Sequence, residues 1–357
     1  MKKALIINEG HAGNLGDTAI DLCLRHVLAE FGYEGRHACF SGCKGGVAKK
    51  GKVGPYRPCR EGSVLTRWRR ALWPTRTLWT LAHLRRILAV LRGVQGELVV
   101  LGGGEMLQPN GVFPWALLLW TALARRAGCR NCVWVGVGVS SGMGLLDRTW
   151  IRLAAGLCDA VYVRDPDSKR RFDELLGREA CRSMPDLAFI LPEVIGKSEC
   201  RPRETVACPA AYDFYCRKQR RNTPMSYGEY EEWWIRRLDR QMKSGDRVTL
   251  VCTGPRRDAE FQAQLAAKLA ERTGQAVEAR CPSTVEELAR CLSVETVLSG
   301  RMHALIIGYS LGARPVAFVT SEKIAAYAGF YFAEGARPEQ WSLEIRAAIR
   351  GLLEGLK

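Results

Sequence analysis

One short motif, Ser299-Gly300-Arg301-Met302-His303, combines residue types that bind anions and move protons. It falls between a predicted strand, residues 296–299, and a predicted helix, residues 304–311. Backbone N–H groups and the helix dipole attract anions at such a turn. Arg301 adds a planar fork for carboxylate or phosphate, and His303 can titrate near neutral pH. The motif therefore indicates a site that binds an anion and transfers a proton.

A second cation is predicted on the same rim. Lys323 follows the next predicted strand, residues 315–319. Ligands of parallel α/β sheets bind at the carboxyl ends of the strands, where Arg301 and His303 would also lie. Taken alone, Lys323 is better explained as a solvated surface lysine. Together the three side chains predict a cationic cluster.

Two glycine-rich turns in the first half of the chain are expected to form the opposing wall of the site. Glycine permits positive φ and close approach of a ligand. Neither turn matches a dinucleotide-binding fingerprint or a P-loop, and Asp17 is also well explained as a helix cap. The candidate site residues of these turns are Asn14, Gly16, Asp17, Gly103, Gly104 and Glu105.

Apolar strands alternate with helices along the 357 residues. Continuous apolar strands separated by helices predict parallel sheets that are covered on both faces. A polar stretch, residues 192–204, is expected to link two such units. We therefore predict an α/β protein with two Rossmann-like domains facing each other across a cleft. The two domains would comprise residues 1–191 and residues 205–357.

The chain is basic, with 53 Lys and Arg against 37 Asp and Glu, and its formal charge is +16. Much of the excess lies in a Trp-rich segment, residues 49–92, because residues 57–92 hold nine Arg and one Glu. One reading is an amphipathic helix on an anionic membrane; the other is a core-packed helix with a solvated basic face. Nucleic acid is disfavoured, because no nucleic-acid-binding motif accompanies the charge. The apolar face is expected to comprise Leu78, Leu81, Ala82, Leu88 and Leu91.

The chain is expected to be cytoplasmic. The first apolar run ends at Ile7, which is too short for a signal-peptide core. The longest near-apolar stretch, residues 115–124, falls short of the roughly 20 residues that a spanning helix needs. If the basic segment contacts lipid, the protein would be peripheral at the inner face of the membrane.

Five motifs occur in an informative order. They are Asn14-Leu15-Gly16-Asp17-Thr18-Ala19-Ile20, Gly102-Gly103-Gly104, Val163-Arg164-Asp165 with Ser168, Pro185-Asp186-Leu187-Ala188-Phe189, and Ser299-Gly300-Arg301-Met302-His303-Ala304-Leu305-Ile306 with the later Lys323. In order and rough spacing this set resembles the polysaccharide pyruvyl transferase family. The resemblance covers about residues 4 to 330, and its last motif is the most specific.

The resemblance implies a fold of the glycosyltransferase B kind, with residues 1–191 on the acceptor side and residues 205–357 on the donor side. The turn residues named above would then be acceptor or loop residues. The resemblance also implies transfer of the enolpyruvyl group of phosphoenolpyruvate to a hexose of a surface polysaccharide or its lipid-linked precursor, giving a pyruvate ketal. His303 would be the general acid, and Arg301, Lys323 and Arg164 would bind the donor. Phosphoenolpyruvate is a substrate, and neither a cofactor nor a metal is expected. Asp165-Pro166-Asp167 has the form of a metal motif but is better explained as a helix cap.

The chain departs from the family in one loop. Residues 136–142 lack the proline and the following basic residue that members often have, and Arg148 and Arg152 are candidate substitutes. Two other functions stay open. A glycosyltransferase on the same fold would use a nucleotide sugar, with Glu286 or Glu287 binding the ribose. A non-enzymatic basic module would bind membranes or polyanions and leave the motif turns unexplained.

Overall fold

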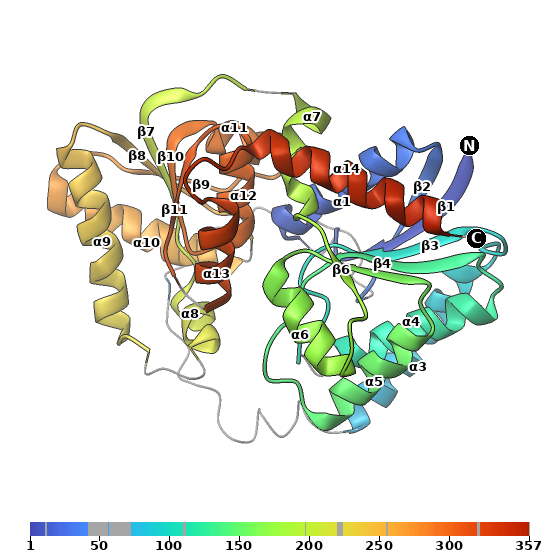
Figure 1. Ribbon diagram of the computed structural model, residues 1–357. Coiled ribbons are helices and arrows are strands. Elements are labelled where there is room, and N and C mark those ends of the chain that lie inside the picture. The colour runs from blue at the N-terminus through green and yellow to red at the C-terminus, as the bar shows by residue number, and fades with distance from the viewer. Residues whose placement is uncertain are drawn as a thin grey trace.

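A computed structural model describes residues 1–10, 13–41, 56, 73–109, 112–196, 198–219, 224–254, 256–319 and 322–356. The chain forms two α/β domains that lie side by side (Figure 1). Each domain is built on one sheet in which all recorded strand pairs are parallel. The predicted fold class is confirmed.

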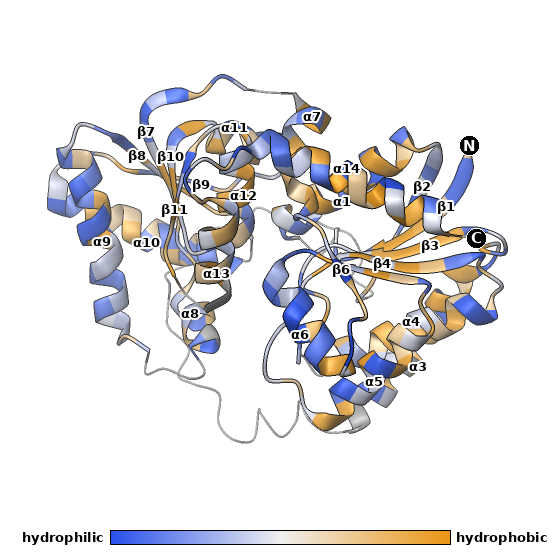
Figure 2. Cartoon of the chain, viewed as in Figure 1, coloured by the Kyte–Doolittle hydropathy of each residue, from blue (hydrophilic) through white to orange (hydrophobic). Residues whose placement is uncertain are grey.

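The first sheet has the strand order β2-β1-β3-β4-β5-β6. Its strands are β1 (Lys2–Asn8), β2 (Tyr33–Cys39), β3 (Leu98–Gly102), β4 (Asn131–Val137), β5 (Ala160–Val163) and β6 (Arg182–Ser183). Strands β3 and β4 are buried along their whole length, as expected of central strands with both faces covered (Figure 2). Successive side chains enter different cores: Ala4 and Ile6 face one, and Leu5 and Ile7 face the other.

Crossover helices cover both faces of the first sheet. They are α1 (Leu15–Glu30), α3 (Trp73–Leu91), α4 (Phe113–Arg126), α5 (Leu145–Gly156) and α6 (Pro166–Leu176). Helix α1 packs on one face, and the other four pack on the opposite face. The glycine-rich segments at the start of α1 and after β3 thus lie at the carboxyl edge of the sheet, where ligands of such folds bind.

The second sheet has the strand order β11-β10-β7-β8-β9. Its strands are β7 (Arg201–Cys208), β8 (Arg247–Val251), β9 (Glu278–Arg280), β10 (Val294–Ser299) and β11 (Arg314–Ala317). Its helices are α8 (Tyr212–Lys218), α9 (Tyr227–Lys243), α10 (Arg256–Thr273), α11 (Val285–Leu292), α12 (Met302–Ser310) and α13 (Glu322–Tyr331). Helices α8 to α10 pack on the outer face, and α11 and α12 on the face toward the first domain.

One hydrophobic core joins the two domains. The chain passes between them through a short 3-10 helix, η1 (Leu187–Ile190), and α7 (Leu191–Ile195). Phe189 of η1 contacts the rings of Tyr331 and Trp341, with centroids 5.4 and 6.2 Å away. The last helix, α14 (Pro338–Gly355), runs from the second domain back over the first (Figure 1), where Arg346 binds Glu30 and Glu193. This packing holds the two sheet edges in a defined relation.

The segment between the domains differs from a simple polar connection. Residues 192–204 contain most of α7 and the first half of β7, which is the central strand of the second sheet. Sequence analysis did not predict β7, because its first half is polar, includes Pro202, and is at most half-buried. Only its second half carries the apolar, buried residues that signal a central strand.

The core-packed interpretation of α3 is wrong for most of its predicted apolar face. Leu78, Leu81, Ala82 and Leu88 are exposed, and of the expected set only Leu91 is buried. Most of the basic segment, residues 49–55 and 57–72, lies outside the described residues.

Polar anchors explain the orientation of α3. Arg76 is buried between Asp147, 3.5 Å away, and the ring of Trp150, 4.1 Å from its guanidinium carbon. Arg86 donates a hydrogen bond of 2.8 Å to the carbonyl oxygen of Cys39. These contacts turn Arg76 and Arg86 inward. Leu78 and Leu81, which lie between them in the helix, therefore point outward.

Within the residues that the structure describes, no helix has both the length and the apolar composition needed to cross a membrane.

Candidate functional site

His303 lies where the two domains touch. It is the second residue of α12, and its ring packs against Gly16, the second residue of α1. A Cβ atom on Gly16 would lie 2.6 Å from Cβ and from Cγ of His303. Glycine is therefore required at this position because the imidazole occupies the space where a side chain would stand. The imidazole is largely buried, with 14% of its side chain exposed.

A buried carboxylate stands beside the imidazole. Oδ2 of Asp186 is 3.7 Å from Nε2 of His303 and 3.4 Å from Nη1 of Arg164. Oδ1 accepts a hydrogen bond of 3.0 Å from the backbone N–H of Ala188, the second residue of η1, and so caps that helix. Burial opposes ionisation, but the contact with His303 and the charge of Arg164 keep the pKa of Asp186 below its ordinary value. Asp186 is therefore a carboxylate facing the ring.

Arg164 is the buried cation of this cluster. It is 2% exposed, and its guanidinium lies between Asp186 and Asp165. Burial disfavours its charge, yet Asp186, Asp165 and Glu105 raise its pKa above the ordinary value. A Cβ on Gly138 would lie 2.7 Å from Nε of Arg164. The guanidinium of Arg164 therefore covers the loop of residues 136–142, which lacks the basic residue that family members often have there. Arg152 instead donates to the carbonyl oxygen of Leu175, on the outer side of the domain.

The two predicted glycine-rich turns meet Arg164 and His303 at the same edge. Asn14 caps α1 by accepting from the N–H of Gly16, and its Nδ2 donates to Asp17 at 2.8 Å. A Cβ on Gly104 would lie 3.0 Å from Oδ1 of Asp17, so that glycine permits close approach of the turn. A Cβ on Gly103 would likewise come too close to the side chain of Ile20. Burial raises the pKa of Asp17, although the charges of His303 and Arg164 oppose the increase.

Glu105 lies at the same edge of the sheet. Its carboxylate accepts a hydrogen bond from the hydroxyl of Ser140, which follows β4. The structure thus brings together seven predicted residues from distant parts of the chain: Asn14, Gly16, Asp17, Gly104, Glu105, Arg164 and His303.

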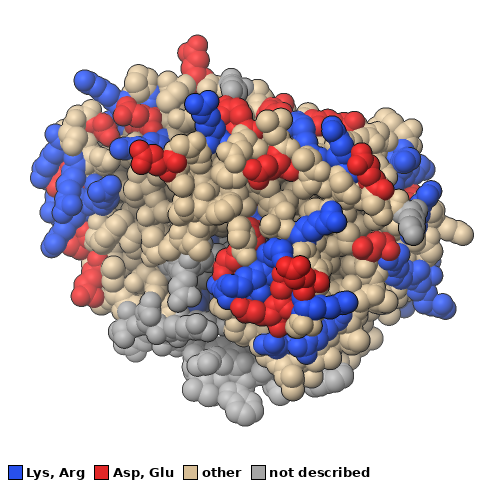
Figure 3. Space-filling view, in the orientation of Figure 1, with Lys and Arg blue, Asp and Glu red and all other residues tan. Residues whose placement is uncertain are grey.

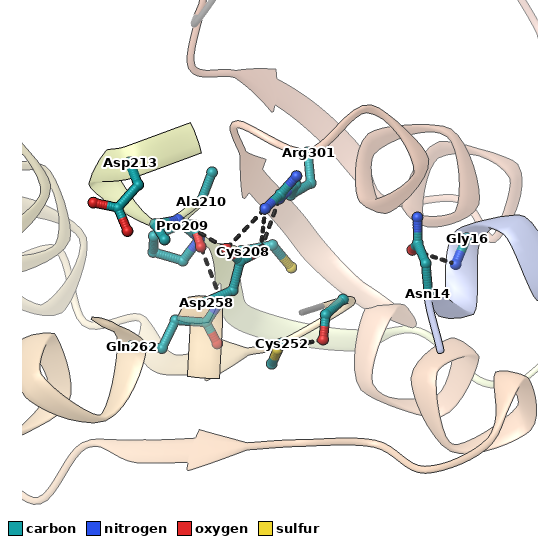
Figure 4. Close-up of polar contacts among 12 residues, drawn as sticks. Asn14, Gly16, Cys208, Pro209, Ala210, Asp213, Cys252, Asp258, Gln262 and Arg301 are labelled. Carbon is teal, nitrogen blue, oxygen red and sulfur yellow. Dashed lines mark hydrogen bonds and ion pairs between the residues drawn. The ribbon is translucent and has the colours of Figure 1, made fainter. Parts of the chain in front are cut away.

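Arg301 points into the second domain and has its own partner (Figure 4). Its Nε and Nη2 donate to the carboxylate of Asp258 on α10, at 2.8 and 2.7 Å, and its guanidinium lies 3.8 Å from the ring centre of Phe214. Asp258 is buried and also accepts from the N–H of Ala211. Sequence analysis missed Asp258, because nothing local to α10 links it to a residue 43 positions later.

The turn after β8 lies between the cluster around His303 and the Arg301–Asp258 pair. The carbonyl oxygen of Thr253 accepts a hydrogen bond from the N–H of Leu15 at the start of α1, 3.2 Å away. A Cβ on Gly254 would lie 3.8 Å from Oδ1 of Asn14 and 4.0 Å from Oδ2 of Asp258. Figure 4 shows Asn14 and Gly16 on one side of Cys252, which precedes this turn, and the Arg301–Asp258 pair on the other. The site is therefore bipartite, with the imidazole cluster at the domain contact and Arg301 beside it.

Two other candidates have structural roles. Asp165 accepts from the N–H and hydroxyl of Ser168 and caps α6, while Glu287 accepts from the N–H and hydroxyl of Ser283 at the start of α11. Lys323 is the second residue of α13, and its side chain lies outside the described residues. In the described part of the chain, no three His, Cys, Asp or Glu side chains gather as metal ligands would.

Two parallel α/β domains meeting at a polar edge define a fold of the glycosyltransferase B kind, and solved structures agree. UDP-GlcNAc 2-epimerase from Methanocaldococcus jannaschii is 11% identical with a TM-score of 0.56, covering 99% of this chain and 100% of that one. UDP-GlcNAc 2-epimerase from Neisseria meningitidis, bound to UDP-GlcNAc, is 11% identical with a TM-score of 0.52, covering 99% and 92%. At such identities the likeness shows the fold alone. No curated protein sequence matches the chain.

The sequence model of one family does match. The model for polysaccharide pyruvyl transferase covers residues 14–322, which include the glycine-rich turns, Arg164, Asp186 and the Arg301–His303 motif. The chain belongs to the polysaccharide pyruvyl transferase family and is a transferase. The resemblance noted from the motifs is confirmed.

The contact between Gly16 and His303 gives the first testable prediction. Gly16→Ala is expected to slow transfer about a hundredfold, because the new methyl group displaces the imidazole by the order of an ångström. Gly228→Ala is the matched control: Gly228 is also the second residue of a helix, and a Cβ there meets nothing within 4 Å. Transfer rates and melting temperatures of both variants test this. Full activity of Gly16→Ala would contradict the placement of His303.

Proposed function

We propose that this chain transfers the enolpyruvyl group of phosphoenolpyruvate to two hydroxyls of one hexose, forming a pyruvate ketal. The acceptor would be a surface polysaccharide or its lipid-linked precursor, and the enzyme would work at the inner face of the membrane. Family membership supports the reaction class. The observation that carries the proposal is the largely buried imidazole of His303, set at the domain contact beside the carboxylate of Asp186.

The proposed reaction begins with a proton. His303 transfers it to C3 of phosphoenolpyruvate, the methylene becomes a methyl group, and C2 becomes an oxocarbenium ion. One sugar hydroxyl attacks C2 and loses its proton. The bond between C2 and the phosphate oxygen then breaks, inorganic phosphate leaves, and the second hydroxyl attacks C2 and loses its proton. Two carbon–oxygen bonds form and one breaks.

The charges around His303 suit this sequence. The carboxylate of Asp186 faces the imidazole of His303, and Arg164 offsets the negative charge of that carboxylate. Arg301, oriented by Asp258, is the proposed ligand of the donor's carboxylate or phosphate, with Lys323 as a further cation. Asn14, Asp17 and Glu105 offer the polar groups for the acceptor side.

Thermal melting with phosphoenolpyruvate, beside a panel of nucleotide sugars, tests the donor. A ligand at a hundredfold excess over its Kd stabilises the folded state by about 2.7 kcal/mol, so phosphoenolpyruvate is expected to raise Tm by several degrees. Arg301→Lys is expected to abolish the shift, because lysine keeps a charge for Asp258 but loses the planar fork. Arg236→Lys, at an exposed arginine that pairs with Glu232, is the matched control.

Two results would overturn the donor assignment. One is a Tm shift with a nucleotide sugar and none with phosphoenolpyruvate, which would favour the glycosyltransferase alternative. The other is an unchanged phosphoenolpyruvate shift in Arg301→Lys, which would remove Arg301 from the donor site.

A further inference from the structure

An exposed apolar surface lies on the outside of the first domain. Helix α3 shows Leu78, Leu81 and Leu88 along one side, and α5 shows Leu145, Leu146 and Leu153. We call these six residues the leucine face. Leu81 is 69% exposed and Leu145 is 76% exposed. Large apolar side chains gathered in this way mark a surface that contacts a partner or a membrane.

The two helices of the leucine face are tied together at their first turns. Arg76 of α3 reaches Asp147 and Trp150 of α5, and Trp150 also packs against Trp115 of α4 with ring centres 5.5 Å apart. The first turns of α3 and α5, which carry or adjoin Leu78, Leu145 and Leu146, are therefore in contact.

The two helices that carry the leucine face are rich in arginine. Helices α3 and α5 carry five Arg and one Asp, and Asp147 is occupied by Arg76. Arg85, Arg92 and Arg152 are exposed and form no ion pair with any described residue. Helix α6 on the same domain is different, because its exposed charges of both signs pair with one another (Figure 3). Apolar side chains flanked by unpaired arginines complement an anionic lipid surface.

The leucine face also lies near the site. In a parallel sheet each crossover helix runs back against the strands, so its first turn lies at the carboxyl edge of the sheet. Leu78, Leu145 and Leu146 are in or next to the first turns of α3 and α5. Asn14, Gly104 and Ser140 lie at that same edge. A membrane against the leucine face would therefore lie beside the edge that carries the candidate acceptor residues.

We propose that the leucine face docks the protein on an anionic membrane, with the leucines entering the interface and Arg85, Arg92 and Arg152 contacting lipid headgroups. Docking needs neither donor nor acceptor, and so it is independent of the proposed reaction. It would bring a lipid-linked saccharide to the carboxyl edge of the first sheet.

Cosedimentation of the full chain with vesicles tests the docking face. The wild type is expected to bind vesicles of equimolar phosphatidylglycerol and phosphatidylcholine, more weakly at high salt, and not vesicles of phosphatidylcholine alone. Leu81→Glu with Leu145→Glu is expected to weaken binding about tenfold or more. Leu343→Glu is the matched control, because Leu343 lies on α14 and is 69% exposed, as Leu81 is. Unchanged melting temperatures show that each variant folds, and the single variants replace the double variant if its Tm falls.

Three outcomes would overturn the docking proposal. They are absence of binding to anionic vesicles, equal binding by the wild type and the leucine variant, and a wild-type dimer that the leucine variant makes monomeric without vesicle binding. The last outcome would identify the leucine face as an interface between two copies of the chain. Transfer to a short soluble saccharide, measured on the same variant, is expected to be unchanged and separates docking from catalysis.

Discussion

His303→Gln is expected to slow pyruvyl transfer about 10²–10⁴-fold while the fold is retained. Glutamine has nearly the size of histidine and still forms hydrogen bonds, but it cannot deliver a proton near neutral pH. Because the ring lies against Gly16 and beside Asp186, a smaller residue would also leave a cavity, and glutamine avoids that second effect. Single-turnover rates with phosphoenolpyruvate and a saccharide acceptor measure the loss of the chemical step.

The control for this prediction is His26→Gln. His26 lies on the outer side of α1, where it pairs with Glu30, and its replacement is expected to leave the rate unchanged. The Tm shift with phosphoenolpyruvate is expected to survive in both variants, because His303 acts on the bound donor. Near-normal transfer by His303→Gln would exclude His303 as the acid, and loss of the Tm shift would instead make it a binding residue.

Asp186→Asn is expected to lower the free energy of unfolding by about 3 kcal/mol. The substitution keeps the shape of the side chain but removes the charge that faces Arg164, which is 2% exposed. The remaining partner of Arg164, Asp165, is 3.8 Å away and already caps α6. Urea unfolding measures the loss. Glu174→Gln, at a surface glutamate that pairs with Arg170, is expected to cost less than about 1 kcal/mol.

The effect of Asp186→Asn depends on pH with a definite sign. The pKa of Asp186 is lowered in the folded protein, so its stabilisation is complete above the ordinary value of 3.8. That stabilisation disappears as the pH falls through the lower, folded value. The difference between wild type and variant is therefore expected to be largest near neutral pH and to shrink in acid.

A double-variant cycle shows whether Asp186 and Arg164 act as a pair. Arg164→Met with Asp186→Asn is expected to cost clearly less than the sum of the two single variants, because the double variant leaves neither member of this pair as a charge facing a neutral partner. Additive losses would contradict the pairing. A reduced transfer rate in Asp186→Asn beyond the loss of folded protein would also show that Asp186 positions His303.

Several features were predictable because they are local. Apolar runs such as the one in β3 identify central strands, and the turns at Asn14 and Gly104 follow from glycine and capping residues. The position of Arg301 and His303 at the start of α12 follows from a strand that ends at Ser299. Strand β7 escaped prediction because its exposed first half lacks the apolar signal.

The orientation of α3 was not predictable from its own residues. Its leucines were compatible with a buried face or with a membrane-facing one, and in the structure Arg76 and Arg86 turn inward to partners on α5 and β2. A helix with apolar residues on more than one side has no single preferred orientation until its neighbours supply hydrogen bonds and ion pairs. The consequence here is an exposed leucine face.

The sequence by itself determined two parallel α/β domains, the order of the motifs, and which residues carry groups for binding anions and moving protons. Only the tertiary structure decided the partners of those groups. Arg301 faces Asp258, Arg164 covers Gly138, and His303 contacts Gly16 and Asp186. These pairs join residues that are mostly far apart along the chain, and their contacts arise when sheet edges and helix ends pack together. Local sequence patterns therefore identify the groups, whereas packing decides their geometry and their charge state.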